Sequence, residues 1–379
     1  MRSSLVVLFG AAVLTSACVN TDRTSPIPPE IDAGEDLSDL GLDAGVTPEP
    51  DLGVPEDAGD DDLGPADTGV DIPDLGPDDR GVEEPDAGPD DLGPEDLGPD
   101  AGPIDIGTLP REITFGTTAR PATLIVPDDY DGTPHPLVVL IHGLGSNGGE
   151  VDTFFGMSAH VDDRDFFLLL PNGSTSNDGT PFWNATPECC NYDMIQVDDV
   201  AYITGLIDDV SMRVNIDSRR VYATGHSNGG FMSYRLACDV PQRFAAIAPL
   251  AGMEPNDPTL CTPSEAVSVL HSHGTDDEAI PYDGLVENDT IQYYPPAEDV
   301  LERWAARGGC DTTQRSYVGT MDASVDFAGD DTDIFAYQTG CRAGLDFILW
   351  RMNGEVHLPS FSNDYVPGVL DFLLSHSKP

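Results

Sequence analysis

The sequence predicts an α/β fold for residues 108–379, with a mostly parallel sheet covered by helices on both faces. Short apolar runs such as 137–141 and 244–250 are bounded by turn residues, as expected of strands buried on both faces. Between such runs lie segments with apolar residues at helical spacing, of which 198–210 is the clearest. Strands that alternate with helices in this way form a parallel sheet, because each helix returns the chain to the same edge.

The segment 221–238 connects a strand directly to a helix through Gly225-His-Ser-Asn-Gly229. A serine within G-x-S-x-G at such a turn is the nucleophile elbow, and its glycines let the strand and the helix approach closely. We therefore predict a serine hydrolase with the α/β-hydrolase fold, in which Ser227 is the nucleophile.

The other predicted elements follow in chain order. Residues 113–115 and 123–126 predict an entering hairpin, and 166–170 predict a further buried strand. Asp198 is placed to cap the helix that follows it. The last predicted elements are strands at 267–270 and 347–350, a helix within 293–307 and a closing helix at 366–375.

The N-terminal residues 1–18 predict an export signal. An apolar run at 5–14 follows Arg2, and it is too short to span a bilayer comfortably. The small residues that end in Cys18 resemble the lipobox of bacterial lipoproteins, so we expect Cys18 to carry lipid; cleavage without lipid is the alternative. The protein is then exported and either anchored at the bacterial cell envelope or secreted, with the lipid as its only membrane contact.

Residues 19–107 predict a disordered acidic stalk. Asp-Leu-Gly and Asp-Ala-Gly units recur there, and residues 31–107 contain 26 acidic residues and one basic residue, Arg80. Like charges repel, and apolar side chains are too sparse to offset the entropy lost on ordering. Calcium binding is the alternative, but the spacing is irregular and the loop pattern of an EF-hand does not occur.

The net charge of −51 excludes binding to nucleic acid and to anionic lipid by charge. The acidity is either an adaptation to salty surroundings or an ordinary bias. If Cys18 carries lipid, six of the seven cysteines remain, and an even number in an exported protein favours disulfides. Because no C-x-x-C pair or His-x-x-x-His spacing occurs, we expect neither a metal nor a cofactor.

A serine nucleophile needs a histidine base and an acid that orients it, in the chain order serine, acid, histidine. Two adjacent acids, Asp276 and Asp277, follow the strand at 267–270. His357 follows the last predicted strand and is the candidate base. His376 is the other late histidine, and we expect it to be solvated in the C-terminal tail.

The remaining candidates surround the nucleophile. The oxyanion of an ester intermediate needs two backbone N–H donors, and we predict Asn228 and, in the loop 142–145, Leu144. The early histidines are expected to be satisfied by local hydrogen bonds, although His226, beside the nucleophile, is also a candidate for substrate contact. These histidines are His142, His226, His271 and His273.

From about Arg111 to the C-terminus, the chain resembles the polyhydroxybutyrate-depolymerase-like esterases, which are related to bacterial feruloyl and acetylxylan esterases. The matching stretches are Pro136–Gly143, Asp217–Gly230, Tyr234–Cys238, Phe244–Gly252 and His273–Tyr282. The resemblance implies an α/β-hydrolase fold and a triad of Ser227, Asp277 and His357, because the H-G-T-x-D pattern of the family selects Asp277. The family usually shows Gly-His-x-Trp-Pro at the histidine, whereas this chain has Val356-His-Leu-Pro359, which alters a wall of the pocket.

The resemblance also implies the disulfides Cys238–Cys261 and Cys310–Cys341. Cys189 and Cys190 then form either a bridge between adjacent residues or two free thiols. Trp183 precedes them, and it either packs its loop onto the domain or contacts a polymer or aryl group of the substrate.

We interpret the chain as a tethered extracellular carboxylesterase, expected to be a monomer, that acts on a small or polymeric ester. The candidate bonds are polyhydroxyalkanoate, feruloyl and acetyl-polysaccharide esters. A peptidase or a thioesterase with the same triad is an alternative, since a fold does not determine the leaving group. A surface-binding lipoprotein without activity is another, although a complete triad in the right order argues against it.

Overall fold

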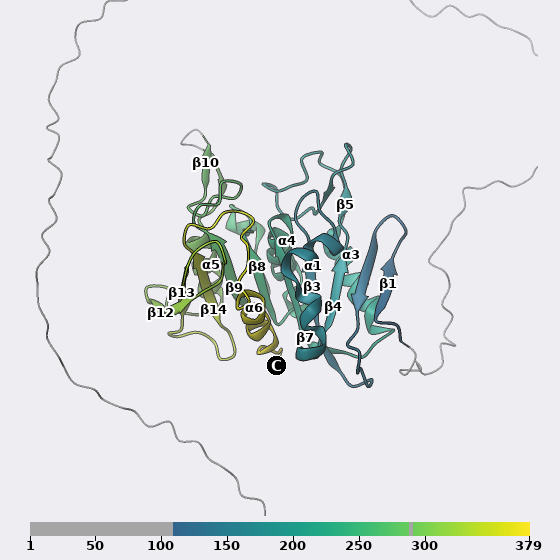
Figure 1. The fold of residues 1–379 in the computed structure, drawn as a ribbon. Helices are drawn as coiled ribbons and strands as arrows, with labels where there is room; N and C mark the ends of the chain where they lie inside the picture. Colours follow the sequence, from purple (N-terminus) through teal and green to yellow (C-terminus); the bar gives the residue numbers. More distant parts are fainter. Residues whose placement is uncertain (1–108, 288–290) are drawn as a thin grey trace, which may run out of the picture. The chain divides into compact units, whose positions relative to one another are not determined.

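A ten-stranded sheet runs through the part of the chain that the computed structural model describes, residues 109–287 and 291–379 (Figure 1). The strand order is β1-β2-β4-β3-β7-β8-β9-β14-β13-β12. The strands are β1 (Glu112–Gly116), β2 (Pro121–Ile125), β3 (His135–Ile141), β4 (Phe167–Pro171), β7 (Ile216–His226), β8 (Ala246–Leu250), β9 (Ser268–Gly274), β12 (Arg315–Met321), β13 (Thr332–Tyr337) and β14 (Phe347–Met352). Two small hairpins lie outside this sheet, β5 (Ser174–Thr175) with β6 (Pro181–Phe182) and β10 (Leu285–Glu287) with β11 (Ile291–Tyr294).

The six neighbouring strands from β4 to β14 run parallel, and the strands outside them pair antiparallel. All residues of β3, β8 and β9 are buried, which agrees with the continuous apolar runs in β3 and β8, whereas β9 also buries polar side chains. Parallel strands end at the same edge of a sheet, so the loops after β7, β9 and β14 lie close together. This arrangement brings distant parts of the chain to one site.

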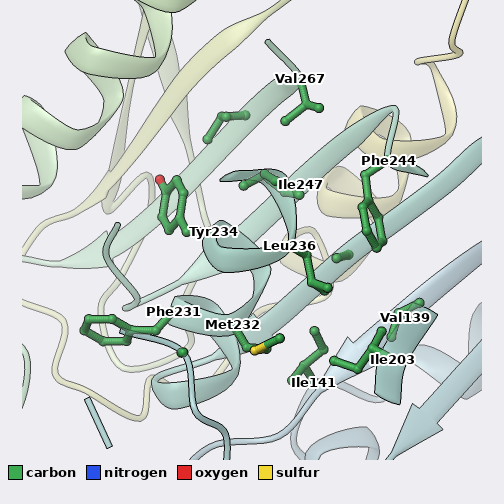
Figure 2. Close-up of a cluster of buried hydrophobic side chains, with 14 of the residues drawn as sticks. Val139, Ile141, Ile203, Phe231, Met232, Tyr234, Leu236, Phe244, Ile247 and Val267 are labelled. Carbon is green, nitrogen blue, oxygen red and sulfur yellow. The ribbon is translucent and has the colours of Figure 1, made fainter. Parts of the chain in front are cut away.

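Helices cover both faces of the sheet, and side chains of β3 alternate between the two cores. Val139 and Ile141 pack in the core beneath α3, α4 and α5 (Figure 2), whereas Leu140 packs in the core beneath α1 and α6. The helices are α1 (Gly148–Phe155), α2 (Val161–Arg164), α3 (Asp199–Ser211), α4 (Asn228–Asp239), α5 (Ala297–Arg307) and α6 (Tyr365–Leu374), with short 3₁₀ turns η2 (Met157–His160), η3 (Pro241–Arg243) and η4 (Pro258–Leu260).

The predicted fold class is confirmed, and the predicted elements lie within a few residues of the observed ones. Asp198 caps α3 as predicted, because its side chain accepts from the N–H of Ala201 at 2.8 Å. The sequence analysis missed α1, which starts with the poor helix formers Gly148 and Gly149. It also missed the hairpin of β12 and β13, since β12 is an exposed edge strand without a buried apolar run.

The prediction that His376 is solvated is wrong. His376 is 6% exposed, at the end of α6. Its Nδ1 lies 2.7 Å from the carbonyl oxygen of Phe372, and its Nε2 lies 3.0 Å from a carboxylate oxygen of Asp346. The closing helix therefore tucks the histidine against the sheet instead of releasing it into solvent.

The predicted signal peptide (1–18), lipid site at Cys18 and stalk (19–107) lie outside the described residues. Within residues 109–287 and 291–379, no helix is both long and apolar enough to cross a membrane.

Three disulfides occur in the described part of the chain. Cys238–Cys261 joins the end of α4 to the segment before β9, and Cys310–Cys341 joins the segment after α5 to the loop between β13 and β14. These are the pairs that the family resemblance implies. Of the two alternatives for Cys189 and Cys190, the structure has the bridge between adjacent residues.

Removing the disulfide between Cys238 and Cys261 by serine substitution at both positions should lower the free energy of unfolding. The bridge spans 23 residues, and closing a loop of that length in the unfolded chain is worth about 3 kcal/mol. Urea denaturation of the native and doubly substituted proteins measures the difference. An unchanged midpoint and slope would show that this bridge does not stabilise the fold.

Candidate active site

Ser227 occupies the sharp turn between β7 and α4. Its backbone angles, φ 54° and ψ −122°, are rarely adopted by a residue with a side chain and cost roughly 1–3 kcal/mol. The N–H of Ser227 donates to the carbonyl of Leu250 at 2.9 Å, and its own carbonyl accepts from the N–H of Phe231 at 2.9 Å. The neighbouring strand and the helix thus hold the serine in this conformation at the carboxyl end of β7.

The glycines on both sides of the serine are required by the packing of β3. A Cβ atom on Gly225 would lie 2.3 Å from the carbonyl oxygen of Ile141, and one on Gly229 would lie 2.0 Å from the same oxygen. These distances are far below van der Waals contact, so either side chain would push β3 away from the elbow. The G-x-S-x-G spacing therefore reflects contact between three elements as well as the turn itself.

Asp277 and His357 meet above neighbouring parallel strands, β9 and β14. The Nδ1 atom of His357 lies 2.7 Å from Oδ2 of Asp277. The N–H of Asp276 donates to the carbonyl of Glu355 at 2.9 Å and ties the two loops together. Asp276 itself is exposed, whereas Asp277 is 4% exposed. Of the two adjacent acids, it is thus Asp277 that reaches the histidine in the structure.

Hydrogen bonds keep the Asp277 carboxylate ionised although it is buried. Burial alone would raise the pKa of Asp277, but bonds from His273, His357 and the N–H of Ile280 hold that pKa well below its usual range. The N–H groups of Ala279 and Ile280 donate to Oδ1 at 2.9 and 2.8 Å. An ionised Asp277 keeps a proton on Nδ1 of His357, which leaves Nε2 free to accept another.

Ser227 and His357 line one open cavity of about 300 Å³. Most of its walls are apolar, and two of its leucines, Leu144 and Leu358, are 42% and 60% exposed. The lining residues are Gly143, Leu144, Ser146, Glu150, Val151, Phe154, His226, Ser227, His357 and Leu358. The cavity therefore offers apolar surface beside the candidate nucleophile and the candidate base.

The two predicted oxyanion donors lie on either side of the nucleophile. Asn228 is the first residue of α4, so its N–H points out of the N-terminus of a helix. Leu144 lies in the turn after β3, in which the N–H of Ser146 donates to the carbonyl of Gly143 at 3.2 Å. Among the described residues, no hydrogen bond occupies the N–H of Asn228 or of Leu144. Both groups are thus available to a ligand.

His226 contacts the candidate base as well as the cavity. Its Nε2 lies 2.7 Å from the carbonyl oxygen of His357, and the two rings are 4.5 Å apart. Burial, together with the proximity of His357, lowers the pKa of His226 to about 3. The neutral ring therefore donates from Nε2 and fixes the backbone of His357. No local sequence pattern predicts this bond, because it joins residues 131 positions apart.

Trp183 does not line the cavity, so its prediction as a substrate-binding residue is corrected. Its side chain is fully buried, and its indole N–H donates to the carbonyl of His142 at 2.9 Å. The side chain of Asn228 accepts from the N–H of Trp183 at 2.7 Å and donates to its carbonyl at 3.0 Å. The tryptophan packs its loop against the elbow, which was the other interpretation of this residue.

The sequence did not indicate that α1 and the segment around Tyr192 line cavities at the site. Because α1 was not predicted, Glu150 and Phe154 were not expected in the cavity wall. Leu144 also borders a second cavity of about 180 Å³, on which the 70% exposed Tyr192 lies.

One cluster of metal-type donors exists among the described residues, formed by Cys238, Glu254 and Cys261. Its two sulfur atoms are bonded to each other. Its carboxylate pairs with Arg303 and Arg307 at 3.2 and 2.5 Å. The cluster is therefore a structural link between α4, α5 and the segment that follows β8.

Known proteins share this fold and this sequence pattern. Over 219 residues the chain is 28% identical to "Putative esterase NocK" of Nocardia uniformis subsp. tsuyamanensis, covering 55% of this chain and 62% of that protein. Over 204 residues it is 29% identical to "Probable feruloyl esterase C" of Aspergillus niger, covering 50% of this chain and 63% of that protein. The chain thus spans less than two thirds of the length of these relatives.

A solved structure, an acetyl xylan esterase from Aspergillus awamori, matches 67% of this chain and 95% of its own. The TM-score is 0.50 and the identity 15%, so this likeness supports the fold alone. Sheet order, elbow and strand-end loops define a protein of the α/β-hydrolase class. Residues 128–291 match the Phospholipase/Carboxylesterase family and the relatives above are named as esterases, so the chain is similar to esterases of that class.

Replacing His226 by glutamine should make stability less sensitive to acid. The pKa of His226 is about 3 in the folded protein and ordinarily 6.5, so between these values the unfolded chain binds a proton that the folded chain does not. Acidification from pH 6 to pH 4 therefore favours unfolding, by up to about 1.4 kcal/mol per pH unit from this residue.

Glutamine keeps a donor near the Nε2 position and removes this titration. Urea denaturation at several pH values should give a shallower pH dependence for His226→Gln than for the native protein. His160→Gln, which changes a partly exposed histidine in η2, is the matched control. Equal slopes for the native protein and His226→Gln would refute the assignment.

Proposed function

We propose that this chain is an exported serine carboxylesterase that acts through Ser227, Asp277 and His357. The observation that carries the proposal is the 2.7 Å contact between His357 and Asp277 beside a cavity that Ser227 also lines. The match of residues 128–291 to the Phospholipase/Carboxylesterase family supports ester hydrolysis as the reaction. The strained backbone at Ser227 supports its role as the nucleophile, because such strain is concentrated at functional sites.

In the proposed reaction, Oγ of Ser227 attacks the ester carbonyl while Nε2 of His357 accepts its proton. His357 then gives that proton to the departing alcohol, which leaves an acyl-enzyme. Water, deprotonated by the same histidine, hydrolyses the acyl-enzyme and restores the serine. Asp277 keeps the histidine in the correct tautomer and stabilises its charged form. The N–H groups of Asn228 and Leu144 stabilise the oxyanion in both steps.

The cavity favours an ester with an apolar acyl group. Phe154, Val151 and Leu358 supply apolar walls beside the proposed nucleophile. An opening lined by exposed leucines also suits a substrate that extends beyond the cavity, such as a polymer or an esterified polysaccharide. We infer a feruloyl, acetyl-polysaccharide or hydroxyalkanoate ester as the natural substrate, and a panel of these three ester types would rank them by kcat/KM.

The place of action that we propose is outside the cytoplasm. The disulfides of the described residues fit an oxidising compartment, and residues 1–18 have the pattern of an export signal. A lipid on Cys18 and the acidic residues 19–107 would place the catalytic domain on a tether. Mass spectrometry of the N-terminal peptide from the native host would reveal the lipid or a free, cleaved terminus.

The native protein should hydrolyse a short-chain 4-nitrophenyl ester, and Ser227→Ala should abolish burst-phase release of nitrophenol. Removing the nucleophile prevents the acyl-enzyme, so the loss should reach several orders of magnitude. Stopped-flow absorbance measures the burst and the steady-state rate. A binding protein without activity would show no turnover in either form, and a peptidase would hydrolyse peptide amides in addition to the activated ester.

Asp277→Asn should lower kcat by several orders of magnitude, whereas Asp276→Asn should change it little. Asparagine can keep the geometry but favours the wrong tautomer of His357, and the corresponding change in the serine-protease triad costs about 10⁴ in kcat. Asp276 is exposed, and its side chain does not bond to His357 in the structure. Steady-state kinetics on one soluble ester, with circular dichroism to verify folding, makes the comparison. A crippled Asp276→Asn beside an active Asp277→Asn would shift the proposed triad by one residue.

A further inference from the structure

A line of three buried polar side chains ends at the carboxylate of Asp277. The line starts with Tyr234 of α4, which Figure 2 shows within the core, and continues through His271 and His273 of β9. The Tyr234 hydroxyl lies 2.7 Å from Nδ1 of His271, and Nε2 of His271 lies 3.2 Å from Nδ1 of His273. The Nε2 of His273 lies 2.7 Å from the Ile280 carbonyl oxygen and 3.3 Å from Oδ2 of Asp277.

The direction of every hydrogen bond in this line follows from its two ends. The carbonyl of Ile280 can only accept, so in a neutral His273 ring Nε2 carries the proton and Nδ1 is an acceptor. His271 must then donate from Nε2 and accept at Nδ1. The acceptor at Nδ1 takes the hydroxyl proton of Tyr234. All three side chains thus have one compatible arrangement, with each donor pointing toward the carboxylate.

Burial keeps the line in this arrangement. Full burial, together with the proximity of His273, lowers the pKa of His271 well below its usual range, so the ring stays neutral. Burial raises the pKa of Tyr234, so its hydroxyl stays protonated. The charged or titratable groups that face the line are Asp277 and Tyr282 at one end and Glu254 and Arg307 at the other.

The polar character of the line is unusual for its position. His271 and His273 are two residues apart on β9, so both point to the face of the sheet that α4 covers. Other side chains on this face, such as Val267 and Val269, are apolar. Placing two imidazoles there costs desolvation that an aliphatic pair would avoid, and each histidine is kept only because its bonds are complete. A purely structural requirement would be met by valine or leucine.

We propose that Tyr234, His271 and His273 are positioning residues that orient the Asp277 carboxylate toward His357. This inference rests on the proposed esterase function. The N–H of His273 donates to the carbonyl of Ile280 and also lies against Oδ2, with Nε2 at 3.3 Å from it, whereas the backbone N–H groups donate to Oδ1. Oδ2 is thereby kept in line with Nδ1 of His357 throughout turnover. None of the three side chains lines the cavity beside Ser227.

Two substitutions of His273 distinguish the role of its donor at Nε2 from that of its acceptor at Nδ1. Glutamine places an amide donor near the Nε2 position, whereas asparagine places its oxygen near Nδ1 and has no atom that reaches Asp277. His273→Asn should lower kcat on a soluble 4-nitrophenyl ester roughly 10²-fold with KM unchanged, because a misplacement of about 1 Å has an effect of that size. His273→Gln should recover most of that loss. Equal kcat for the two variants would overturn the proposal.

A second, milder test changes only one oxygen atom at the far end of the line. Tyr234→Phe should lower kcat about fivefold, the effect of losing one ordinary hydrogen bond, without changing KM. Tyr222→Phe is the matched control, since Tyr222 is also fully buried and donates to a carbonyl, that of His376, at 2.6 Å. If the two phenylalanine variants have the same kcat, the line does not act on the site, even if His273→Asn fails to fold.

The same assay separates this inference from the proposed function. If Ser227→Ala and Asp277→Asn retain activity, the triad itself is wrong and the line has nothing to position. If those two variants are inactive but Tyr234→Phe and a folded His273→Asn retain native kcat, the triad stands and the positioning role is refuted. Thermal unfolding of every variant shows whether a loss of kcat comes from a loss of folded protein.

Discussion

Close contact between the carbonyl of Ile141 and the two elbow glycines determines how this site can be built. It leaves no room for a Cβ atom on either glycine. With β3, β7 and α4 in direct backbone contact, the turn at Ser227 has one geometry, and the loop that follows β3 is brought beside the same serine. The oxyanion donors predicted at Leu144 and Asn228 therefore depend on one packing contact, although they lie on different elements.

Buried polar side chains hold the loop that contains Trp183 against the elbow. The loop with Trp183 is held by the side chain of Asn228, which bonds to the backbone of Trp183, and by Asp199, which accepts from the N–H of the next residue, Asn184. The Asp199 carboxylate is completely buried and pairs with Arg120 at 2.7 Å. A buried pair of this kind contributes little net stability, but removing one partner would leave an uncompensated charge. It therefore specifies where the loop must lie rather than how stable the domain is.

Local sequence patterns predicted most of the strands and helices of the fold. The burial of single side chains and the long-range hydrogen bonds depend on tertiary contacts and were not predicted. Apolar runs predicted the parallel strands, the G-x-S-x-G motif and chain order pointed to Ser227 and His357 as candidates, and the family resemblance selected Asp277 over Asp276. His376 was expected to be solvated but is buried, because a place near the terminus says little about burial; of the two interpretations of Trp183, the structure has the one in which it packs its loop. The bond from His226 to the carbonyl of His357 joins residues that no local pattern relates, whereas His273 and Asp277 lie within one H-G-T-x-D motif.

Several histidines can lie close together near the site because burial keeps their rings neutral. Burial lowers the pKa of His142, His226 and His271, so these rings stay neutral at physiological pH. Neutral rings with fixed tautomers act as directed donors and acceptors and add no positive charge beside Asp277. The attraction between the ionised carboxylate of Asp277 and His357 is therefore not weakened by a neighbouring positive charge. The ring of His357 is 21% exposed at the cavity. As His357 takes up a proton during the proposed reaction, the carboxylate stabilises that new charge, and the neighbouring neutral histidines do not oppose it.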